Sequence, residues 1–88
     1  MLFALGSVFA TPQALDLLTE NGITVAELLH RHGNGDYGDL PDDDILQNRR
    51  AIDLGERVVS AYLVARQKVY VITEWDRSMT TVLMAYQY

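Results

Sequence analysis

The stretch that decides the fold lies in the last third of the chain and begins Arg57-Val58-Val59-Ser60-Ala61-Tyr62-Leu63-Val64-Ala65. It is rich in β-branched and aromatic residues, which favour strands. Two further runs have the same character, Lys68–Trp75 and Met79–Tyr86. Only Arg66-Gln67 and Asp76-Arg77-Ser78 separate the three runs, and connections this short predict an antiparallel meander.

Upstream of the meander, the sequence predicts one strand and a first helix. The apolar segment Leu2–Ala10 is predicted to be a strand. Thr11-Pro12 then starts a helix, because Thr caps free amides and Pro at the first helical position has no amide to leave unpaired. Asn21-Gly22 marks its end.

Two more helices are predicted before the meander. Thr24 and Glu27 have the spacing of a capping box, and Gly33 ends the helix that they start. The histidines His30 and His32 fall in its last turn, where we expect them to be helix-end cations. Together with the first helix it forms a predicted helical hairpin. The third helix runs from Pro41 to Gly55 and carries acidic residues in its first turn.

The order of one strand, three helices and three strands predicts an α+β fold with the helices on one face of the sheet. A chain of 88 residues corresponds to a single domain, residues 1–88. There is no cysteine, which excludes disulfides and thiolate chemistry and favours a reducing compartment. No apolar run has the length of a membrane span, and the first ten residues lack the positive charge of a signal peptide. We therefore expect a cytoplasmic protein without a membrane partner.

The net charge of −5 is concentrated in one place. Five carboxylates fall within nine residues with no basic residue among them, namely Asp36, Asp39, Asp42, Asp43 and Asp44. This charge disfavours direct binding of nucleic acid, which needs a basic face. It permits binding to a basic protein surface, including one that normally holds nucleic acid. The alternative is a solvated acidic loop that keeps the protein soluble.

The acidic run begins inside an irregular loop, His32-Gly33-Asn34-Gly35-Asp36-Tyr37-Gly38-Asp39-Leu40. Three glycines in this space are incompatible with a packed helix or strand. Tyr37 has two alternatives: an exposed anchor for a partner, or a plug folded back over the helical hairpin. Asp76 and Arg77 are expected to have structural roles. Asp76 forms a turn, and Arg77 pairs with a carboxylate such as Asp36 or Asp39 and pins the loop to the sheet.

With these motifs placed, the chain resembles a family of small uncharacterised bacterial proteins found on plasmids and integrated mobile elements. The resemblance covers nearly the whole chain and rests on the glycine-rich loop, on Asn48, and on two blocks, Gly55–Tyr62 and Val71–Leu83. It implies no activity that can be transferred residue by residue. The chain departs from the family at its end, where Met84-Ala85-Tyr86-Gln87-Tyr88 replaces a more acidic tail. We expect this tail to extend the edge strand, the alternative being a partner contact.

Three functions remain open. The preferred one is a small, acidic, non-enzymatic module that binds a protein through Asp36, Tyr37, Asp39, Asp42, Asp43 and Asp44. Its most specific version is an anti-CRISPR or anti-restriction inhibitor that occupies the basic nucleic-acid-binding surface of a defence complex, without any cofactor. The first alternative is a metal-dependent hydrolase or other small enzyme using His32, Asp36, Asp39 and Glu74. The second is a structural homodimer joined through an exposed edge strand at Val82–Tyr86.

Overall fold

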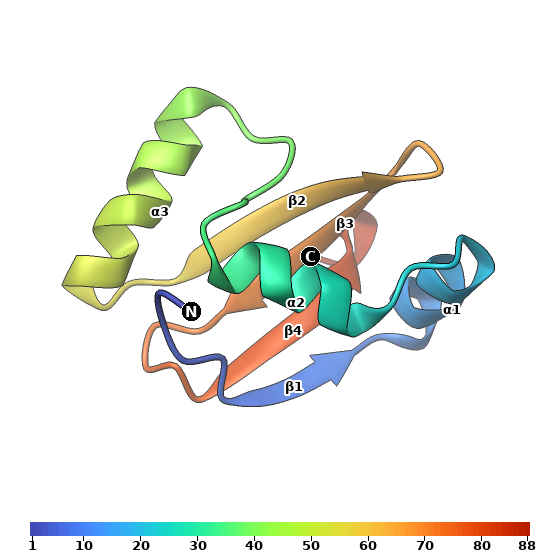
Figure 1. The fold of residues 1–88 in the computed structure, drawn as a ribbon, viewed down its shortest axis with the longest axis horizontal. Coiled ribbons are helices and arrows are strands. Elements are labelled where there is room, and N and C mark those ends of the chain that lie inside the picture. Colours follow the sequence, from blue (N-terminus) through green and yellow to red (C-terminus); the bar gives the residue numbers. More distant parts are fainter.

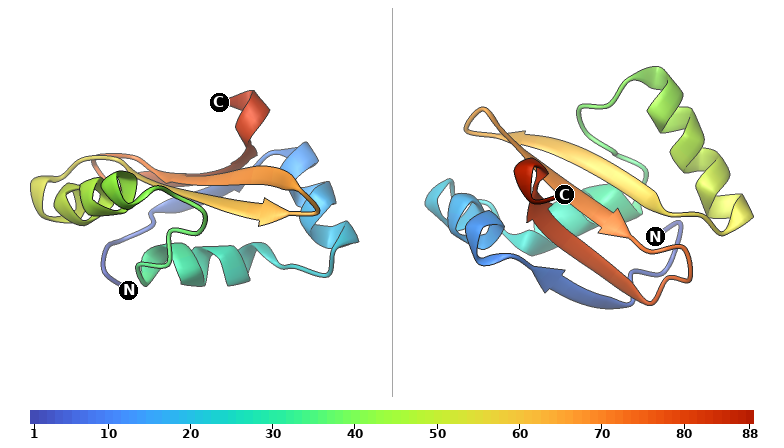
Figure 2. Two further views of the ribbon diagram at one scale, coloured as in Figure 1. Left: turned by 90° about the horizontal axis from the view of Figure 1, so that it is seen from above. Right: turned by 180° about the vertical axis from the view of Figure 1, so that it is seen from behind.

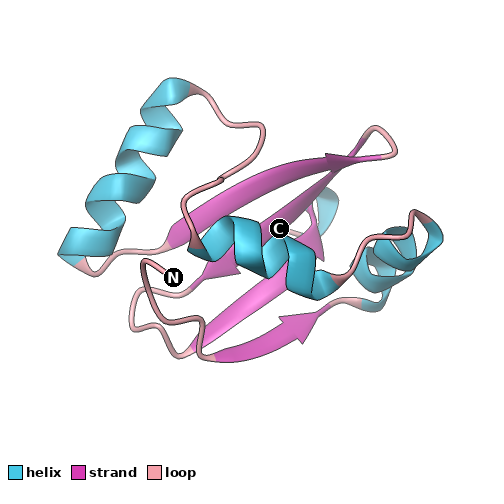
Figure 3. Cartoon of the chain, in the orientation of Figure 1, coloured by secondary structure: helices cyan, strands magenta, loops and turns pink.

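The computed structural model describes all residues, 1–88, and confirms the α+β class (Figure 1; Figure 3). The elements follow the chain in the order β1 (Ser7–Ala10), α1 (Pro12–Glu20), α2 (Val25–Gly33), α3 (Asp42–Leu54), β2 (Val58–Val64), β3 (Gln67–Thr73), β4 (Met79–Met84) and a 3₁₀ turn, η1 (Ala85–Gln87). None of the three helices has both the length and the apolar character needed to cross a membrane.

The sheet is mixed, with strand order β1-β4-β3-β2. Strands β2, β3 and β4 form the predicted antiparallel meander. Strand β1 joins it at the far side of β4 in parallel, with Ser7 opposite Met79 and Ala10 opposite Val82. The sheet therefore contains the predicted meander and one additional, parallel strand. Strand β4 lies between β1 and β3, and the chain leaves the sheet after Met84, so Val82–Tyr86 is not the exposed edge strand through which the homodimer alternative would pair.

The sequence predicts that the helices cover one face of the sheet, and this prediction is wrong. Helices α1 and α2 lie on one side, α3 lies beside the β2 edge at the level of the sheet, and η1 lies on the opposite side (Figure 2). Only Asn48 and Ala51 of α3 are buried, so this helix has too small an apolar face to cover a sheet. It lies beside the sheet, so the face of the sheet opposite to α1 and α2 is only partly covered.

The main core lies between the sheet and the first two helices. Alternate residues of β2 point into it, including Tyr62 and Val64, while Leu63 between them is exposed. The buried members of this core are Ala14, Leu17, Leu18, Leu28, Tyr62, Val64, Val69, Val71, Val82 and Met84.

Both ends of the chain differ from the prediction. The N-terminal strand covers only Ser7–Ala10, because Gly6 has a φ of +66° and the backbone turns there. A Cβ at Gly6 would also clash with the backbone of Ser78. At the other end, β4 stops at Met84 and the chain turns back as η1, so the predicted strand through Tyr86 is too long.

Candidate functional site

The glycine-rich loop lies along the outer edge of β2. The amide of Ala61 donates to the carbonyl of Tyr37 (3.0 Å), and the amide of Asp39 donates to the carbonyl of Ala61 (2.7 Å). These two bonds make a short parallel bridge at Gly38. The loop therefore occupies backbone groups that an edge strand would otherwise leave open to pairing with another chain.

Gly38 allows this close approach. Its φ is +75°, and a Cβ there would collide with the carbonyl oxygen of Ala61 and lie 2.6 Å from Cδ1 of Tyr62. Backbone and a buried ring cannot both move away, so only glycine fits. The sequence predicts an irregular loop that is pinned to the sheet, and the structure places this loop along the outer edge of β2.

Asn48 of α3 covers the next part of the same edge. Its side-chain amide donates to the carbonyl of Val59 (2.7 Å), and its carbonyl accepts from the amide of Val59 (3.1 Å). The side chain is buried and substitutes for the backbone of a neighbouring strand. Asn48 is one of the residues on which the family resemblance rests. In the structure it joins α3 to the sheet.

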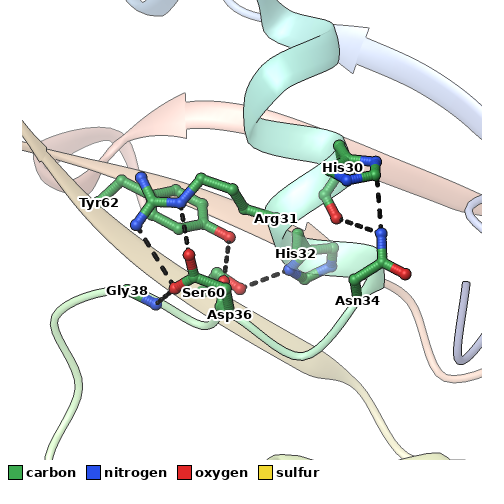
Figure 4. A network of polar contacts seen from close by, with 8 residues as sticks. All are labelled: His30, Arg31, His32, Asn34, Asp36, Gly38, Ser60 and Tyr62. Atoms are coloured by element: carbon green, nitrogen blue, oxygen red, sulfur yellow. Dashed lines mark hydrogen bonds and ion pairs between the residues drawn. The ribbon is translucent and has the colours of Figure 1, made fainter.

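Asp36 does not lie free for a partner (Figure 4). Its carboxylate pairs with the Arg31 guanidinium at 2.7 Å and also accepts from the amide of Gly38 (3.1 Å). The hydrogen bond from Arg31 lowers the pKa of Asp36, and the same bond raises the pKa of Arg31. The guanidinium lies 4.5 Å from the ring centre of Tyr62, whose hydroxyl donates to the Asp36 carbonyl (2.6 Å). Asp36 therefore holds the loop, a role that we had assigned to Arg77.

Tyr37 is folded inward and only 3% exposed, so it is not a partner anchor. Rather than covering the helical hairpin, it packs with Ala51 of α3 and Val58 of β2 in a second, small core. Its hydroxyl is buried without any hydrogen-bond partner. Burial raises the pKa of Tyr37. An unpaired buried hydroxyl lowers the stability of the folded state by about 1–3 kcal/mol.

His32 lies at the centre of a buried chain of hydrogen bonds, and it is fully buried. Its Nδ1 is 2.6 Å from Oγ of Ser60, and its Nε2 is 2.9 Å from Oγ1 of Thr73. Thr73 in turn contacts Thr80 (2.7 Å), whose hydroxyl donates to the carbonyl of Leu5 (2.7 Å).

The direction of this chain follows from its last acceptor. A carbonyl can only accept, so Thr80 donates to Leu5, Thr73 donates to Thr80, and Nε2–H of His32 donates to Thr73. Nδ1 then carries no proton and accepts from Ser60. Burial lowers the pKa of His32 to about 4, so it is neutral at pH 7. The expectation that it would be a helix-end cation is wrong. Its structural role is to tie α2 to the sheet.

The residues of the metal-dependent alternative are not brought together. Both ring nitrogens of His32 are engaged, and Asp36 pairs with Arg31. No group of three or more His, Asp or Glu side chains lies close enough to hold a metal ion. His32, Asp36, Asp39 and Glu74 therefore do not form a metal-binding group.

Arg77 pins a different part of the fold from the one expected. It donates to backbone carbonyls of Ala51 and Glu56 and not to a carboxylate. It therefore joins the end of α3 to the β3–β4 turn. Asp76 forms the expected turn, with its carboxylate accepting from the amide of Ser78 (3.0 Å). Hydrogen bonding from the Ser78 side chain first, and from its amide second, lowers the pKa of Asp76.

The remaining carboxylates of the run are free. We call Asp39, Asp42, Asp43 and Asp44 the acidic surface: all four are exposed, and their side chains make no hydrogen bond or ion pair. They flank the start of α3, where the helix dipole favours negative charge.

A groove of about 480 Å³ opens beside the acidic surface. Asp44 and Glu56 line it together with two aromatic side chains, Tyr70 and Tyr88, whose ring centres are 5.8 Å apart. The Arg57 guanidinium lies 5.4 Å from the Tyr88 ring. We call this the aromatic groove. Sequence reasoning missed Glu56, Tyr70 and Tyr88, although the aromatic tail was a signal that a contact existed.

No protein-family model matches this chain, and no curated protein and no solved structure matches it either. What the site does must therefore be argued from its own residues.

Proposed function

We propose that this protein is a small, acidic, non-enzymatic module that binds a protein partner of opposite charge. The partner surface is basic, and in the most specific version it is the nucleic-acid-binding surface of a defence complex such as a CRISPR or restriction system. The protein would occupy that surface with carboxylates where phosphates otherwise lie. The resemblance to mobile-element proteins supports the choice of partner class by association only.

The observation that carries this proposal is the set of four unpaired carboxylates of the acidic surface, placed next to the aromatic groove. The other carboxylate of the run, Asp36, is neutralised by Arg31. Charge complementarity speeds association and selects partners, whereas most of the binding energy in interfaces comes from a few residues, among which Trp, Tyr and Arg are enriched. The acidic surface and the groove together offer both contributions.

The aromatic groove also has the composition to receive basic side chains. Asp44 and Glu56 supply negative charge at its rim, and Tyr70 and Tyr88 supply ring faces. Arg57 also lines the groove and its guanidinium lies over the Tyr88 ring, so an arginine of a partner would make the same kind of contact by displacing Arg57 or by stacking on Tyr70. Binding through these groups would weaken as salt rises, because the charges are exposed and screened.

The first experiment is a tagged pull-down from a host-like lysate, with and without nuclease treatment, analysed by mass spectrometry. A stoichiometric nucleic-acid-handling complex that survives nuclease treatment would support the proposal. With that partner purified, its affinity is compared for the wild type and for a variant with Asp42→Asn, Asp43→Asn and Asp44→Asn.

The matched control removes the same charge elsewhere. Asp16, Glu20 and Glu27 are exposed on α1 and α2, away from the acidic surface, and their amide variants change the net charge equally. We expect the acidic-surface variant to lose at least about tenfold in affinity and the control variant to lose little. Equal losses in both variants, or none in either, would rule out recognition by this surface.

A further inference from the structure

The two edges of the sheet differ in how they are protected. At the β2 edge, the glycine-rich loop forms the bridge at Gly38, and the Asn48 side chain binds the backbone of Val59. At the opposite edge, β1 pairs only with β4, and no other element lies beyond it (Figure 1; Figure 2). An uncovered edge strand offers backbone donors and acceptors that can pair with another strand.

The pairing of β1 with β4 shows which backbone groups of β1 are free. The amide of Thr11 donates to the carbonyl of Val82 in β4 (2.9 Å), and the amide of Ser7 donates to the residue just before β4 (3.0 Å). In a parallel pair, every second residue directs its N–H and C=O toward the partner strand. Since Ser7 and Thr11 face β4, Val8 and Ala10 direct their N–H and C=O groups outward.

The side chains of β1 allow a second chain to approach closely. All four residues are exposed, Val8 to 40% and Phe9 to 53%. Val82, opposite Ala10, belongs to the main core, so the alternation of the strand places Phe9 on the other face of the sheet. The segment from Leu2 to Leu15 contains no charged residue. It therefore lacks the charges with which edge strands commonly prevent pairing.

The position of the negative charge favours a second copy of this chain as the occupant of the β1 edge. Each copy has a net charge of −5, so two copies repel each other unless their acidic parts are kept apart. The acidic surface lies beside β2, and the strand order puts β2 and β1 at opposite edges of the sheet. Contact through β1 therefore joins two copies at their uncharged edges.

We propose that two copies of this chain pair through antiparallel β1 strands, which joins their sheets into one continuous sheet. The register follows from the outward backbone groups: Val8 exchanges two hydrogen bonds with Ala10 of the second copy, and Ala10 does the same with Val8 of the second copy. Phe9 then lies opposite Phe9 of the second copy, on the two-fold axis, where an aromatic pair adds stability. A register centred on Val8 would pair Ala10 with Gly6, where the backbone turns with a φ of +66°. This inference does not rest on the proposed function, because both acidic surfaces stay free in the dimer.

Sedimentation equilibrium of the full chain tests for the dimer. One short strand from each copy makes a small contact, so we expect a dissociation constant on the order of 100 µM and a measurement from about 5 µM to about 1 mM. Phe9→Lys places two like charges opposite each other on the axis and is expected to weaken dimerisation at least about tenfold. The matched control, Leu63→Lys, makes the same charge change at an exposed residue of β2, far from β1, and should leave dimerisation unchanged.

Amide hydrogen exchange tests the register. The amides of Val8 and Ala10 are expected to exchange more slowly as the protein concentration rises through the dissociation constant. Those of Ser7 and Thr11 already bond within one copy and should change less. Ala10→Pro removes an outward N–H that the single copy does not use. It is expected to weaken dimerisation at least about tenfold and to keep the urea unfolding curve of the monomer.

Four results would overturn the proposal. They are a monomer throughout this concentration range, a dimer that both Phe9→Lys and Ala10→Pro leave intact, equal weakening by Leu63→Lys, and protection of the Val8 and Ala10 amides only when a partner protein is added. The last result would assign the β1 edge to an extended strand of that partner.

Discussion

Acidification is expected to destabilise this protein in a pH range set by His32. The folded protein holds this side chain neutral, because burial lowers its pKa to about 4. An unfolded histidine has a pKa of about 6.5. Between these two pH values the unfolded state binds a proton at His32 and the folded state does not, so the free energy of unfolding falls as the pH falls.

The size of the effect follows from the two pKa values. At pH 7 histidine is mostly neutral in both states, and little stability is lost. At pH 5 the loss is about 2 kcal/mol, and at pH 4 it is about 3 kcal/mol, approaching the limit set by a difference of about 2.5 pKa units at 1.36 kcal/mol per unit. Below pH 4 the folded state also takes up the proton, and this contribution stops growing. A domain of this size has only about 5–10 kcal/mol to lose.

The assay is urea unfolding followed by circular dichroism at several pH values between 7 and 4. The matched variant is His30→Gln, which removes the exposed histidine of the same helix and is expected to keep the pH dependence. Long-range ¹H–¹⁵N spectra of the imidazole rings give a second, direct readout. They should show His32 neutral at pH 6, with its proton on Nε2. A charged ring at pH 6, or a proton on Nδ1, would refute the argument from the buried hydrogen-bond chain.

Three further predictions concern the β2 edge and the small core, and each is measured as the free energy of unfolding in urea. Gly38→Ala is expected to cost more than about 2 kcal/mol, because the new Cβ meets backbone at a positive φ. Gly22→Ala, with a φ of +67° but open space around it, should cost only about 1 kcal/mol, and equal costs would contradict the steric argument. Asn48→Ala is expected to cost about 2–3 kcal/mol through two lost hydrogen bonds to the strand edge, while Gln47→Ala, exposed beside it, should stay within about 0.5 kcal/mol. Tyr37→Phe should leave stability unchanged or raise it by up to about 1 kcal/mol, because its hydroxyl has no partner; a clear loss would mean that the hydroxyl is satisfied.

The regular elements could be predicted because their signals are local. The β-branched and aromatic composition of β2 and the caps Thr11 and Thr24 are local features of the sequence, and both caps accept the expected backbone amides, from Ala14 and Glu27. The position of β1 could not be predicted in this way. Its pairing with β4 joins residues about seventy positions apart, and no property of Ser7–Ala10 alone selects a parallel partner.

The candidate site was predicted less well, because the roles of its residues depend on tertiary contacts. His32 has the position of a helix-end cation, yet it is buried and contacts Ser60 and Thr73 from two strands that are distant in the sequence. Arg31 lies in the last turn of α2, and its ion pair with Asp36, five residues further on, forms only because the loop turns back after the helix ends. The aromatic groove depends on the chain reversal at η1, which brings Tyr88 onto Tyr70.

The structure separates the residues that build the loop from those that are free to bind. Asp36 and Gly38 hold the loop against β2, so changes at either act on stability first. The side chains of Asp39 and of the three aspartates at the start of α3 make no hydrogen bond or ion pair, so their neutralisation should cost only the helix-dipole contribution, about 0.3–1 kcal/mol for each residue in the first turn. Binding variants of the acidic surface can therefore be made in a folded protein. A variant that loses its partner while keeping its unfolding curve would place recognition on that surface and not on the loop that supports it.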